Sequence, residues 1–400
     1  MGDQPTFEDL KARLPEIQEA IREAGLDGWL LYDLHARNMV AAKLVGHGDM
    51  SRRWFVLIPG DGEPRALVHG IEELPWQHWP WSRERYVGWQ ELADALRTLV
   101  GSAQRVAMEF SPGNAVPAVD LVPAGVLERV LATGVEVVSS ADLVTLFHAR
   151  WSTEQLASHR RAAAVLAQVA EATFRRLAGA VGDGQTPREA EVMDWVIADL
   201  AARGCGVGSD CIVATGVNAA NPHYGPVDGG AAFKRGDVVL LDLWAKEAED
   251  AVYADQTWMA YLGAQVPERP AQLFEIIRDA RDAAVRRAEE VWASGKELRG
   301  YELDDAARAV VTDGGYGAFF IHRTGHSIDR DTHGAGPNID NLETHETRLI
   351  VPGVGYSIEP GIYIPGEVGL RTEINVYVSE SGPEVTTPHP QDAVAALLPD

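Results

Sequence analysis

The sequence has few cysteines and no long apolar run, and both shortages limit what the protein can be. Its 400 residues include only Cys205 and Cys211. Two cysteines cannot hold a chain of this length together, and their spacing fits no zinc-binding pattern. We therefore expect two buried or half-buried thiols in a reducing compartment. The longest apolar runs, such as 238–241, have the length of a strand and fall far short of a membrane-spanning helix.

Positive charge is also scarce, with 35 Lys and Arg residues against 59 Asp and Glu residues and a formal net charge of −24. An acidic chain repels nucleic-acid phosphates and anionic lipid, so we expect neither as a partner. The segment 1–8 lacks the basic start and the apolar core of a signal peptide, which predicts a cytoplasmic protein. Part of the negative charge is available to bind cations.

The length and the ordinary apolar content of 46% predict a globular protein of two domains. Strands and helices alternate over the first 150 residues, which predicts an α/β domain at 1–150. The helix at its start is expected to kink or restart at Pro15. The expected helices are 7–24 and 92–100, and the expected strands are 28–32, 54–58, 65–68, 105–108 and 135–138.

Residues 151–400 predict a second domain of the α+β class, with paired helices followed by antiparallel strands. Thr186 to Glu189 have the pattern of a capping box and predict the start of a helix that ends at Arg203. The other expected helices are 154–180, 270–293 and 303–311, and the expected strands are 211–214, 238–244, 251–260 and a β-rich segment at 318–385.

Trp76, Trp79, Trp81 and Trp89 lie close together in the first domain. They fit a hydrophobic loop packed on its own domain. They also fit an aromatic rim over a binding site, including one in a partner subunit.

Four carboxylates border apolar strands in the second domain. Asp242 lies within the strand at 238–244, and Asp255 lies across a predicted hairpin from it. Glu359 and Glu373 flank two further strand-like segments. An ionised carboxylate among aliphatic side chains costs several kcal/mol unless it is paired or bound to a metal.

Histidines cluster nearby, with His322, His326 and His333 within one short segment. Four carboxylates and one imidazole form an oxygen-rich ligand set suited to two divalent ions such as Mn, Co, Fe or Zn. Two such ions about 3.5–4 Å apart can share a water molecule, lower its pKa towards about 7 and polarise a carbonyl group.

The order of these residues resembles the pita-bread metallopeptidases, and among them the Xaa-Pro group of prolidase and aminopeptidase P. The matching motifs are Asp242 to Asp255, the segment His322-x-x-Gly325-His326-x6-His333, Glu359-Pro360-Gly361-Ile362-Tyr363 and Arg371-x-Glu373. The resemblance covers the chain and implies an α/β N-terminal creatinase-like domain at 1–150 plus an α+β pita-bread catalytic domain at 151–400.

The resemblance also implies a role for each site residue. The two ions would be bound by Asp242, Asp255, His326, Glu359 and Glu373, with Asp255 and Glu373 bridging both. Glu359 would accept a proton from the shared water. His223 would relay a proton or contact the substrate, and His322 and His333 would line the substrate side. Arg371, on the same side, would orient a metal-binding carboxylate.

The chain departs from the family pattern at several positions. Asp242 and Asp255 are 13 residues apart rather than the usual 11, which keeps both side chains on the same sheet face because strands alternate with period two. Ser327 and Asp329 replace two family glycines, and Gly334 replaces a residue that is often acidic. Arg348 cannot be aligned with the arginine that binds the substrate carboxylate in classical dipeptidases.

The predicted function is metal-dependent hydrolysis of the bond before proline in short peptides, most simply by a Xaa-Pro dipeptidase (prolidase). The alternatives are a Xaa-Pro aminopeptidase that acts on longer peptides and a non-catalytic binding protein on the same fold. A serine hydrolase is a weaker candidate, because the segment around Ser327 lacks the second glycine of a nucleophile elbow. The family resemblance further implies a homodimer, and manganese, cobalt or zinc as the metal.

Overall fold

The computed structural model describes residues 6–46 and 50–399. The very start of the chain, which enters the expectation of a cytoplasmic protein, lies outside these residues. The chain divides into two compact units, Met1–His148 and Ala149–Asp400. Within the described residues, no helix is long and apolar enough to cross a membrane.

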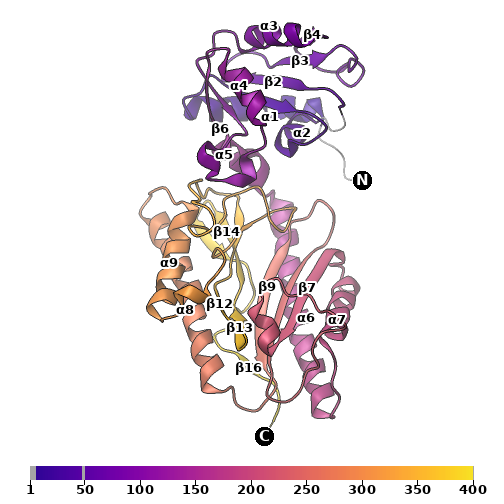
Figure 1. The fold of residues 1–400 in the computed structure, drawn as a ribbon, viewed down its shortest axis with the longest axis vertical. Helices are drawn as coiled ribbons and strands as arrows, with labels where there is room; N and C mark the ends of the chain where they lie inside the picture. The colour runs from indigo at the N-terminus through magenta and orange to yellow at the C-terminus, as the bar shows by residue number, and fades with distance from the viewer. Residues whose placement is uncertain (1–5, 47–49, 400) are drawn as a thin grey trace. The chain divides into compact units, whose positions relative to one another are not determined.

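Unit 1, residues 1–148, contains a six-stranded mixed sheet with the strand order β4-β3-β2-β1-β5-β6 (Figure 1). The central strand β1 runs antiparallel to β2 and parallel to β5. The strands are β1 (Gly28–Asp33), β2 (Trp54–Pro59), β3 (Arg65–His69), β4 (Ser82–Tyr86), β5 (Arg105–Met108) and β6 (Glu136–Ser139). The helices are α1 (Phe7–Glu23), α2 (Met39–Val45), α3 (Trp89–Val100), α4 (Ala124–Leu131) and α5 (Ala141–Val144).

Helix α1 continues through Pro15 as one element, so the predicted restart does not occur. Proline removes one backbone hydrogen bond from a helix. The loss is tolerated because Leu10, Ile17 and Ile21 bury their side chains on both sides of it.

The tryptophan-rich segment packs mainly on its own unit. Trp76 is fully buried, and its ring lies 5.6 Å from that of Trp54 and 5.6 Å from that of Phe7. Trp79 is also buried and meets the Phe7 ring edge-on at 5.1 Å. Trp89, in contrast, is 66% exposed. The loop-packing alternative therefore holds for Trp76 and Trp79, whereas Trp89 is available at the surface.

Unit 2, residues 149–400, places helices on both sides of its strands. In Figure 1, α6 and α7 lie on one side and α8 and α9 on the other, with the strands between them. One sheet has the order β16-β9-β8-β7, a second has the order β10-β11-β14-β15, and β12 pairs with β13. The helices are α6 (Thr153–Gly182), α7 (Glu189–Ala202), α8 (Glu268–Ala293) and α9 (Gly300–Asp313). The strands are β7 (Val207–Thr215), β8 (Val238–Lys246), β9 (Ala254–Tyr261), β10 (Ser327–Ile328), β11 (Gly355–Ile358), β12 (Gly361–Ile364), β13 (Val368–Arg371), β14 (Ile374–Ser379), β15 (Gly382–Val385) and β16 (Ala395–Ala396).

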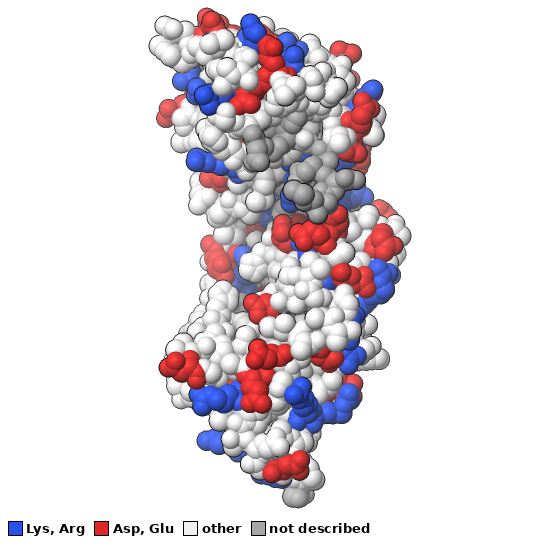
Figure 2. Space-filling model, turned by 90° about the vertical axis from the view of Figure 1, so that its right-hand side faces the viewer, with Lys and Arg blue, Asp and Glu red and all other residues white. Residues whose placement is uncertain are grey.

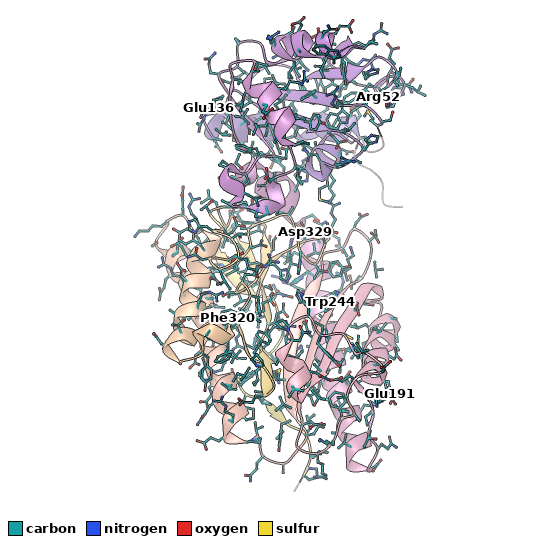
Figure 3. The ribbon with its side chains drawn as sticks, viewed as in Figure 1. Arg52, Glu136, Glu191, Trp244, Phe320 and Asp329 are labelled. Carbon is teal, nitrogen blue, oxygen red and sulfur yellow. The ribbon has the colours of Figure 1, made fainter. Side chains whose placement is uncertain are left out.

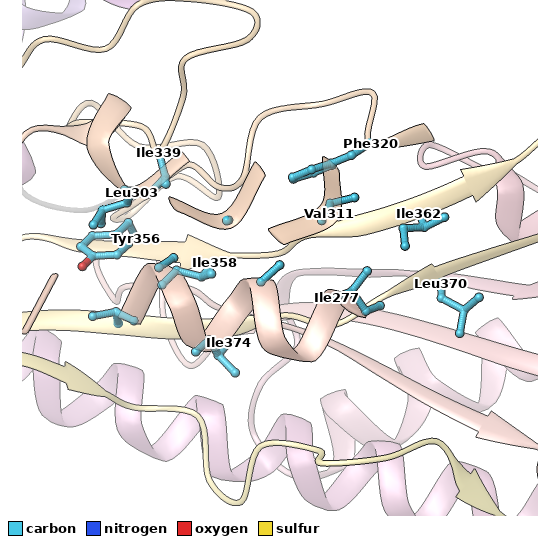
Figure 4. Packing of buried hydrophobic residues seen from close by; sticks show 14 of the residues in the cluster. Ile277, Leu303, Val311, Phe320, Ile339, Tyr356, Ile358, Ile362, Leu370 and Ile374 are labelled. Atoms are coloured by element: carbon cyan, nitrogen blue, oxygen red, sulfur yellow. The ribbon is translucent and has the colours of Figure 1, made fainter. Parts of the chain in front are cut away.

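Two large hydrophobic clusters, and a third small one, stabilise unit 2. In one, Ile277 of α8 and Leu303 of α9 pack with residues of β11 to β14, including Ile358 and Leu370 (Figure 4). In the other, α6 and α7 pack on β7, β8 and β9. The first cluster also contains residues of β7, β8 and β9, so apolar side chains lie on both faces of that sheet.

The predicted capping box at the start of α7 is wrong. Helix α7 begins at Glu189 without a side-chain cap, and Thr186 is exposed. The Glu189 carboxylate is fully buried and accepts hydrogen bonds from the Ala231 backbone N–H and the Tyr224 hydroxyl, both at 2.6 Å. These donors satisfy a carboxylate that would otherwise be costly to bury, and they hold it away from the helix end.

The charged side chains of both signs are interspersed over the face drawn in Figure 2, rather than forming one extended basic surface. This arrangement agrees with the mixed charge of the sequence, in which acidic residues outnumber basic ones.

Candidate active site

The hairpin of β8 and β9 supplies two of the predicted metal ligands. Asp242 pairs with Thr257 across the hairpin, and Asp255 pairs with Trp244. Residues paired across antiparallel strands share a face, as do residues two apart on one strand. Asp242 and Asp255 therefore lie diagonally on the same face, as the 13-residue spacing predicts.

The other sheet of unit 2 brings Glu373 to the same place. Glu373 lies between β13 and β14. Asn375, two residues further on in β14, joins this sheet to β9 through hydrogen bonds of its side chain. Its side-chain oxygen accepts from the Asp255 N–H at 2.9 Å, and its amide nitrogen donates to the Asp255 carbonyl at 2.6 Å. One buried side chain thus fixes the backbone of Asp255 against the strand that follows Glu373.

Asp255, His326 and Glu373 form the centre of the cluster, with one potential ligand atom from each within 4.8 Å of the others. The His326 Nε2 atom lies 3.6 Å from Asp255 Oδ2 and 3.4 Å from Glu359 Oε1. Asp242 is connected through Thr257, whose Oγ1 lies 3.1 Å from Asp242 Oδ1 and 2.9 Å from Glu373 Oε2. The structure thus brings together all five predicted metal ligands.

Arg371 is a cation in contact with this cluster. Its guanidinium donates to Asp242 Oδ2 and, through Nε at 2.9 Å, to the Thr257 hydroxyl. Arg371 is buried. Such a contact suits the task that the family resemblance implies for Arg371, because a fixed guanidinium restricts the Asp242 side chain to one direction.

Burial dominates the electrostatics of the carboxylates. It raises the pKa of Asp242, although Arg371 opposes the shift. Burial and the negative charges of neighbouring carboxylates hold the pKa values of Asp255 and Glu373 well above their ordinary range. Burial would also raise the pKa of Glu359, but the adjacent histidines and Arg371 outweigh it, and the pKa of Glu359 is lowered.

A cavity of about 990 Å³ opens on this cluster. Its walls include all nine predicted site residues: His223, Asp242, Asp255, His322, His326, His333, Glu359, Arg371 and Glu373. Residues far apart in the sequence therefore share one open cavity, large enough for a short peptide.

The predicted substrate-side histidines lie at different depths. The His333 ring centroid is 4.4 Å from that of His326, and His333 is itself exposed at the cavity surface. Partial desolvation, together with the neighbouring His326 and Arg323, lowers the pKa of His333 to about 4. The Nε2 atom of His322 lies 2.8 Å from the Tyr363 hydroxyl, and burial also lowers the pKa of His322. His223 is exposed, on the segment between β7 and β8.

Several cavity residues were missed by the sequence reasoning, among them Trp244, Arg323, Asp331 and Glu343. Trp244 was detectable, because it lies two residues after Asp242 on the same strand. Arg323 lies within the quoted motif between His322 and His326, but its position there carried no chemical signal. Asp331 and Glu343 belong to loops whose course only the tertiary structure determines.

The structure also shows what surrounds Arg348 and Ser327. Arg348 is buried and bonded to Glu346, with a 2.6 Å contact between Arg348 Nη2 and Glu346 Oε2, and it does not belong to the cavity wall as described. Ser327 is 1% exposed, and its hydroxyl oxygen accepts from the Gly336 N–H at 2.9 Å. A serine in this state is not an accessible nucleophile, which removes the serine hydrolase alternative.

The ligand chemistry fits divalent cations. Four carboxylates and an imidazole form the cluster, while among the described residues one guanidinium, that of Arg371, contacts a carboxylate there. The raised pKa values of Asp255 and Glu373 mean that their negative charge lacks compensation. Divalent ions bound between these oxygen atoms would supply the missing positive charge.

Residues 157–380, more than half of the chain, match the sequence profile of metallopeptidase family M24. The protein therefore belongs to this family, as predicted, and the family implies divalent metal ions.

A Xaa-Pro dipeptidase of Lactobacillus delbrueckii subsp. lactis is 37% identical over 164 residues, which cover 41% of this chain and 40% of that protein. The matched region spans about two fifths of the length of such curated relatives.

Solved structures confirm the predicted fold class over nearly the whole chain. Dipeptidase PepE from Mycobacterium ulcerans superposes with a TM-score of 0.71 at 24% identity, covering 97% of this chain and 98% of that one. A prolidase from Thermococcus sibiricus superposes with a TM-score of 0.62 at 21% identity, covering 97% and 99%. The chain thus has an N-terminal α/β domain and a pita-bread catalytic domain.

Proposed function

We propose that the protein is a dinuclear-metal-dependent Xaa-Pro dipeptidase. The observation that carries this proposal is the convergence of Asp242, Asp255, His326, Glu359 and Glu373 on one cavity. The name of the Lactobacillus relative supports the substrate class.

The five side chains are proposed as the residues that would hold two divalent ions, and the family resemblance implies that Asp255 and Glu373 would be shared between them. Manganese, cobalt and zinc all suit this oxygen-rich set. When bound, two such ions lower the pKa of a water molecule and polarise the scissile carbonyl group. Glu359, which lies 3.4 Å from His326, is proposed to be the residue that would accept a proton here, because its lowered pKa keeps it ionised.

The histidines and Arg371 act around this centre. His333 is proposed to hold the scissile carbonyl and the oxyanion that develops from it, and His223 to relay a proton at the exposed side. His322, fixed by the Tyr363 hydroxyl at 2.8 Å, borders the substrate. Arg371 keeps the Asp242 carboxylate in its binding direction.

The preference for a dipeptide is supported by Arg323. It lines the cavity, and its guanidinium makes no ion pair with the residues that the structure describes. A free C-terminal carboxylate would be a suitable partner.

The X-Pro bond is a tertiary amide with a constrained ring and no N–H, so a shaped pocket replaces the strand-like backbone pairing of other peptidases. The alternative is an aminopeptidase P-like enzyme that cleaves longer peptides.

We further propose a cytoplasmic homodimer with domains at 1–150 and 151–400. Both cysteines are free and buried, which agrees with a reducing compartment. Unit 1 exposes the large apolar side chains Ile71, Leu74, Val87 and Trp89, by 62–73% each. Such exposure is suited to a subunit contact.

Hydrolysis of a Xaa-Pro dipeptide and of a Xaa-Pro-Xaa tripeptide should be compared after chelation and addition of Mn, Co or Zn. We expect rapid cleavage of the dipeptide with metal and none without it. Cleavage of the longer peptide alone would favour the aminopeptidase. Tight binding of both peptides without cleavage under any metal would favour the binding protein.

A further inference from the structure

The loop that carries His333 is held by a carboxylate behind it. Asp329 follows β10 directly, is 8% exposed and is not part of the cavity wall as described (Figure 3). Its Oδ1 accepts from the Asp331 N–H at 2.7 Å, and its Oδ2 accepts from the Ala335 N–H at 2.8 Å. These amides lie on either side of His333, so one carboxylate closes the loop around the histidine.

Ser327 closes the same loop from the preceding strand. Its side-chain oxygen accepts from the Gly336 N–H at 2.9 Å, and its backbone oxygen accepts from the Gly334 N–H at 2.7 Å. A glycine at position 327 or 329 would provide no side-chain acceptor. The two residues that depart from the family glycines therefore bond the segment that contains His333.

The loop glycines fit these side chains closely. A Cβ atom added at Gly334 would lie 2.8 Å from Asp329 Oδ2 and 2.9 Å from Ser327 Oγ, and one at Gly336 would lie 2.6 Å from Ser327 Oγ. Real Cβ atoms do not approach oxygen this closely. The departures at 327, 329 and 334 thus form one packed arrangement rather than three unrelated changes.

The first residues of the loop are also fixed to the sheet that carries the aspartates. The Lys246 ammonium at the end of β8 donates to the Arg330 carbonyl at 2.7 Å. The Tyr253 N–H, just before β9, donates to the Asp329 carbonyl at 3.0 Å. Loosening of the Asp329 side chain would therefore act on residues 331–335 and leave the start of the loop attached.

We propose that Asp329 is a positioning residue that fixes His333 beside the metal-binding His326, and that Ser327 assists it. The proposal deepens the peptidase function and rests on it. If His333 holds the scissile carbonyl as it becomes an oxyanion, its displacement weakens an interaction made in the transition state. Such a loss lowers kcat more than it raises KM.

The test compares Asp329→Ala and Asp329→Asn with the wild-type metal-loaded enzyme, each with His333 intact and with His333→Ala. Metal content is measured for every variant. Asp329→Ala is expected to lower kcat about 10- to 100-fold with His333 present, and to have little effect when His333 is absent. Asp329→Asn keeps one oxygen acceptor, so its kcat should lie between those of the wild type and Asp329→Ala. It replaces the alanine variant if that variant does not fold.

Asp237→Ala is the matched control. The Asp237 carboxylate also bonds a backbone amide in a turn, that of Lys234 at 2.9 Å, but away from the described cavity wall. It should change stability and leave kcat unchanged. An equal loss of kcat from Asp329→Ala with and without His333 would overturn the proposal, as would a loss that follows reduced metal content.

Amide hydrogen exchange over residues 330–336 provides a readout that does not depend on catalysis. Faster exchange at Asp331 and Ala335 in Asp329→Ala is expected, and unchanged exchange would contradict the positioning role. If the wild-type enzyme cleaves no Xaa-Pro peptide, the proposed function fails on that result. The exchange data then decide alone whether Asp329 holds the loop.

Discussion

Negative side chains outnumber positive ones around the cavity, and single residues decide how this charge is tolerated. Asp242 is paired with Arg371, while Asp255 and Glu373 have raised pKa values that reflect uncompensated burial. The same imbalance that would destabilise a metal-free protein favours cations.

Replacement of Arg371 by methionine should destabilise the metal-free protein by about 3–5 kcal/mol, because the buried Asp242 loses its partner. Denaturant unfolding with and without Mn²⁺ measures this, and added metal should restore part of the loss. Arg269→Met, at an exposed ion pair with Glu367, is the control and should change stability by about 0.5 kcal/mol or less. An unchanged unfolding midpoint for Arg371→Met would contradict the role of the pair.

His159 should make the stability of unit 2 depend on pH. Burial lowers its pKa from the ordinary 6.5 to about 4. Between pH 4 and pH 6.5, His159 is protonated in the unfolded chain but neutral in the folded protein. The stabilising effect is therefore complete above about pH 6.5 and is lost as the pH falls towards 4, by about 3 kcal/mol in all.

The difference in unfolding free energy between the wild type and His159→Gln, measured from pH 7 to pH 4, isolates this residue from the other titrating groups. The wild type should lose its advantage as the pH falls. A difference that stays constant across the range would show that His159 is not the responsible group.

Residue identities at the site were predictable from the sequence because motifs preserve the order and spacing of the ligands. The residues that support them through hydrogen bonds were harder to predict. Thr257, Asn375 and Glu189 bond residues distant in the chain, and nothing in their local sequence indicates these contacts. The Glu189 example also shows how a tertiary contact can override a capping pattern.

At the scale of elements, the join between β9 and β14 positions the centre of the site. Asn375 satisfies both the N–H and the carbonyl of Asp255. Replacement of Asn375 by alanine should leave both groups unsatisfied and cost roughly 2–4 kcal/mol of stability. It should also weaken metal binding, since Asp255 loses its support.

Chemical denaturation and metal titration of Asn375→Ala measure the two effects. Asn341→Ala, at an exposed asparagine bonded to Asp305, is the control and should behave like the wild type. Loss of stability without any change in metal affinity would show that the hydrogen bonds between β9 and β14 do not support the metal site.

The strands and helices with strong periodic patterns were predicted closely, and those without were not. β8 and β9 form the expected antiparallel hairpin, and β5 has the expected bounds. β4 was missed because its sequence, Ser82 to Tyr86, is mostly charged and exposed. Its strand conformation depends on pairing with β3 rather than on apolar alternation.

At the scale of the whole molecule, the exposed apolar side chains of unit 1 lead to a prediction about assembly. Leu74→Asp combined with Trp89→Asp should weaken the proposed homodimer, because charge at a contact opposes burial. Sedimentation velocity over a range of concentrations measures the change. Leu131→Asp, at another exposed apolar residue of unit 1, is the control. A wild type that remains monomeric at every concentration would contradict the proposed dimer.

Metal content per chain tests the dinuclear site most directly. Purified protein is saturated with Mn²⁺, freed of excess ions and analysed by elemental analysis, alongside His326→Ala and Glu373→Ala. We expect about two ions per wild-type chain, about one for His326→Ala, which loses a ligand of a single ion, and close to none for Glu373→Ala, which loses a ligand shared by both. A wild-type chain without bound metal, or a Glu373→Ala chain that retains two ions, would contradict the proposed centre.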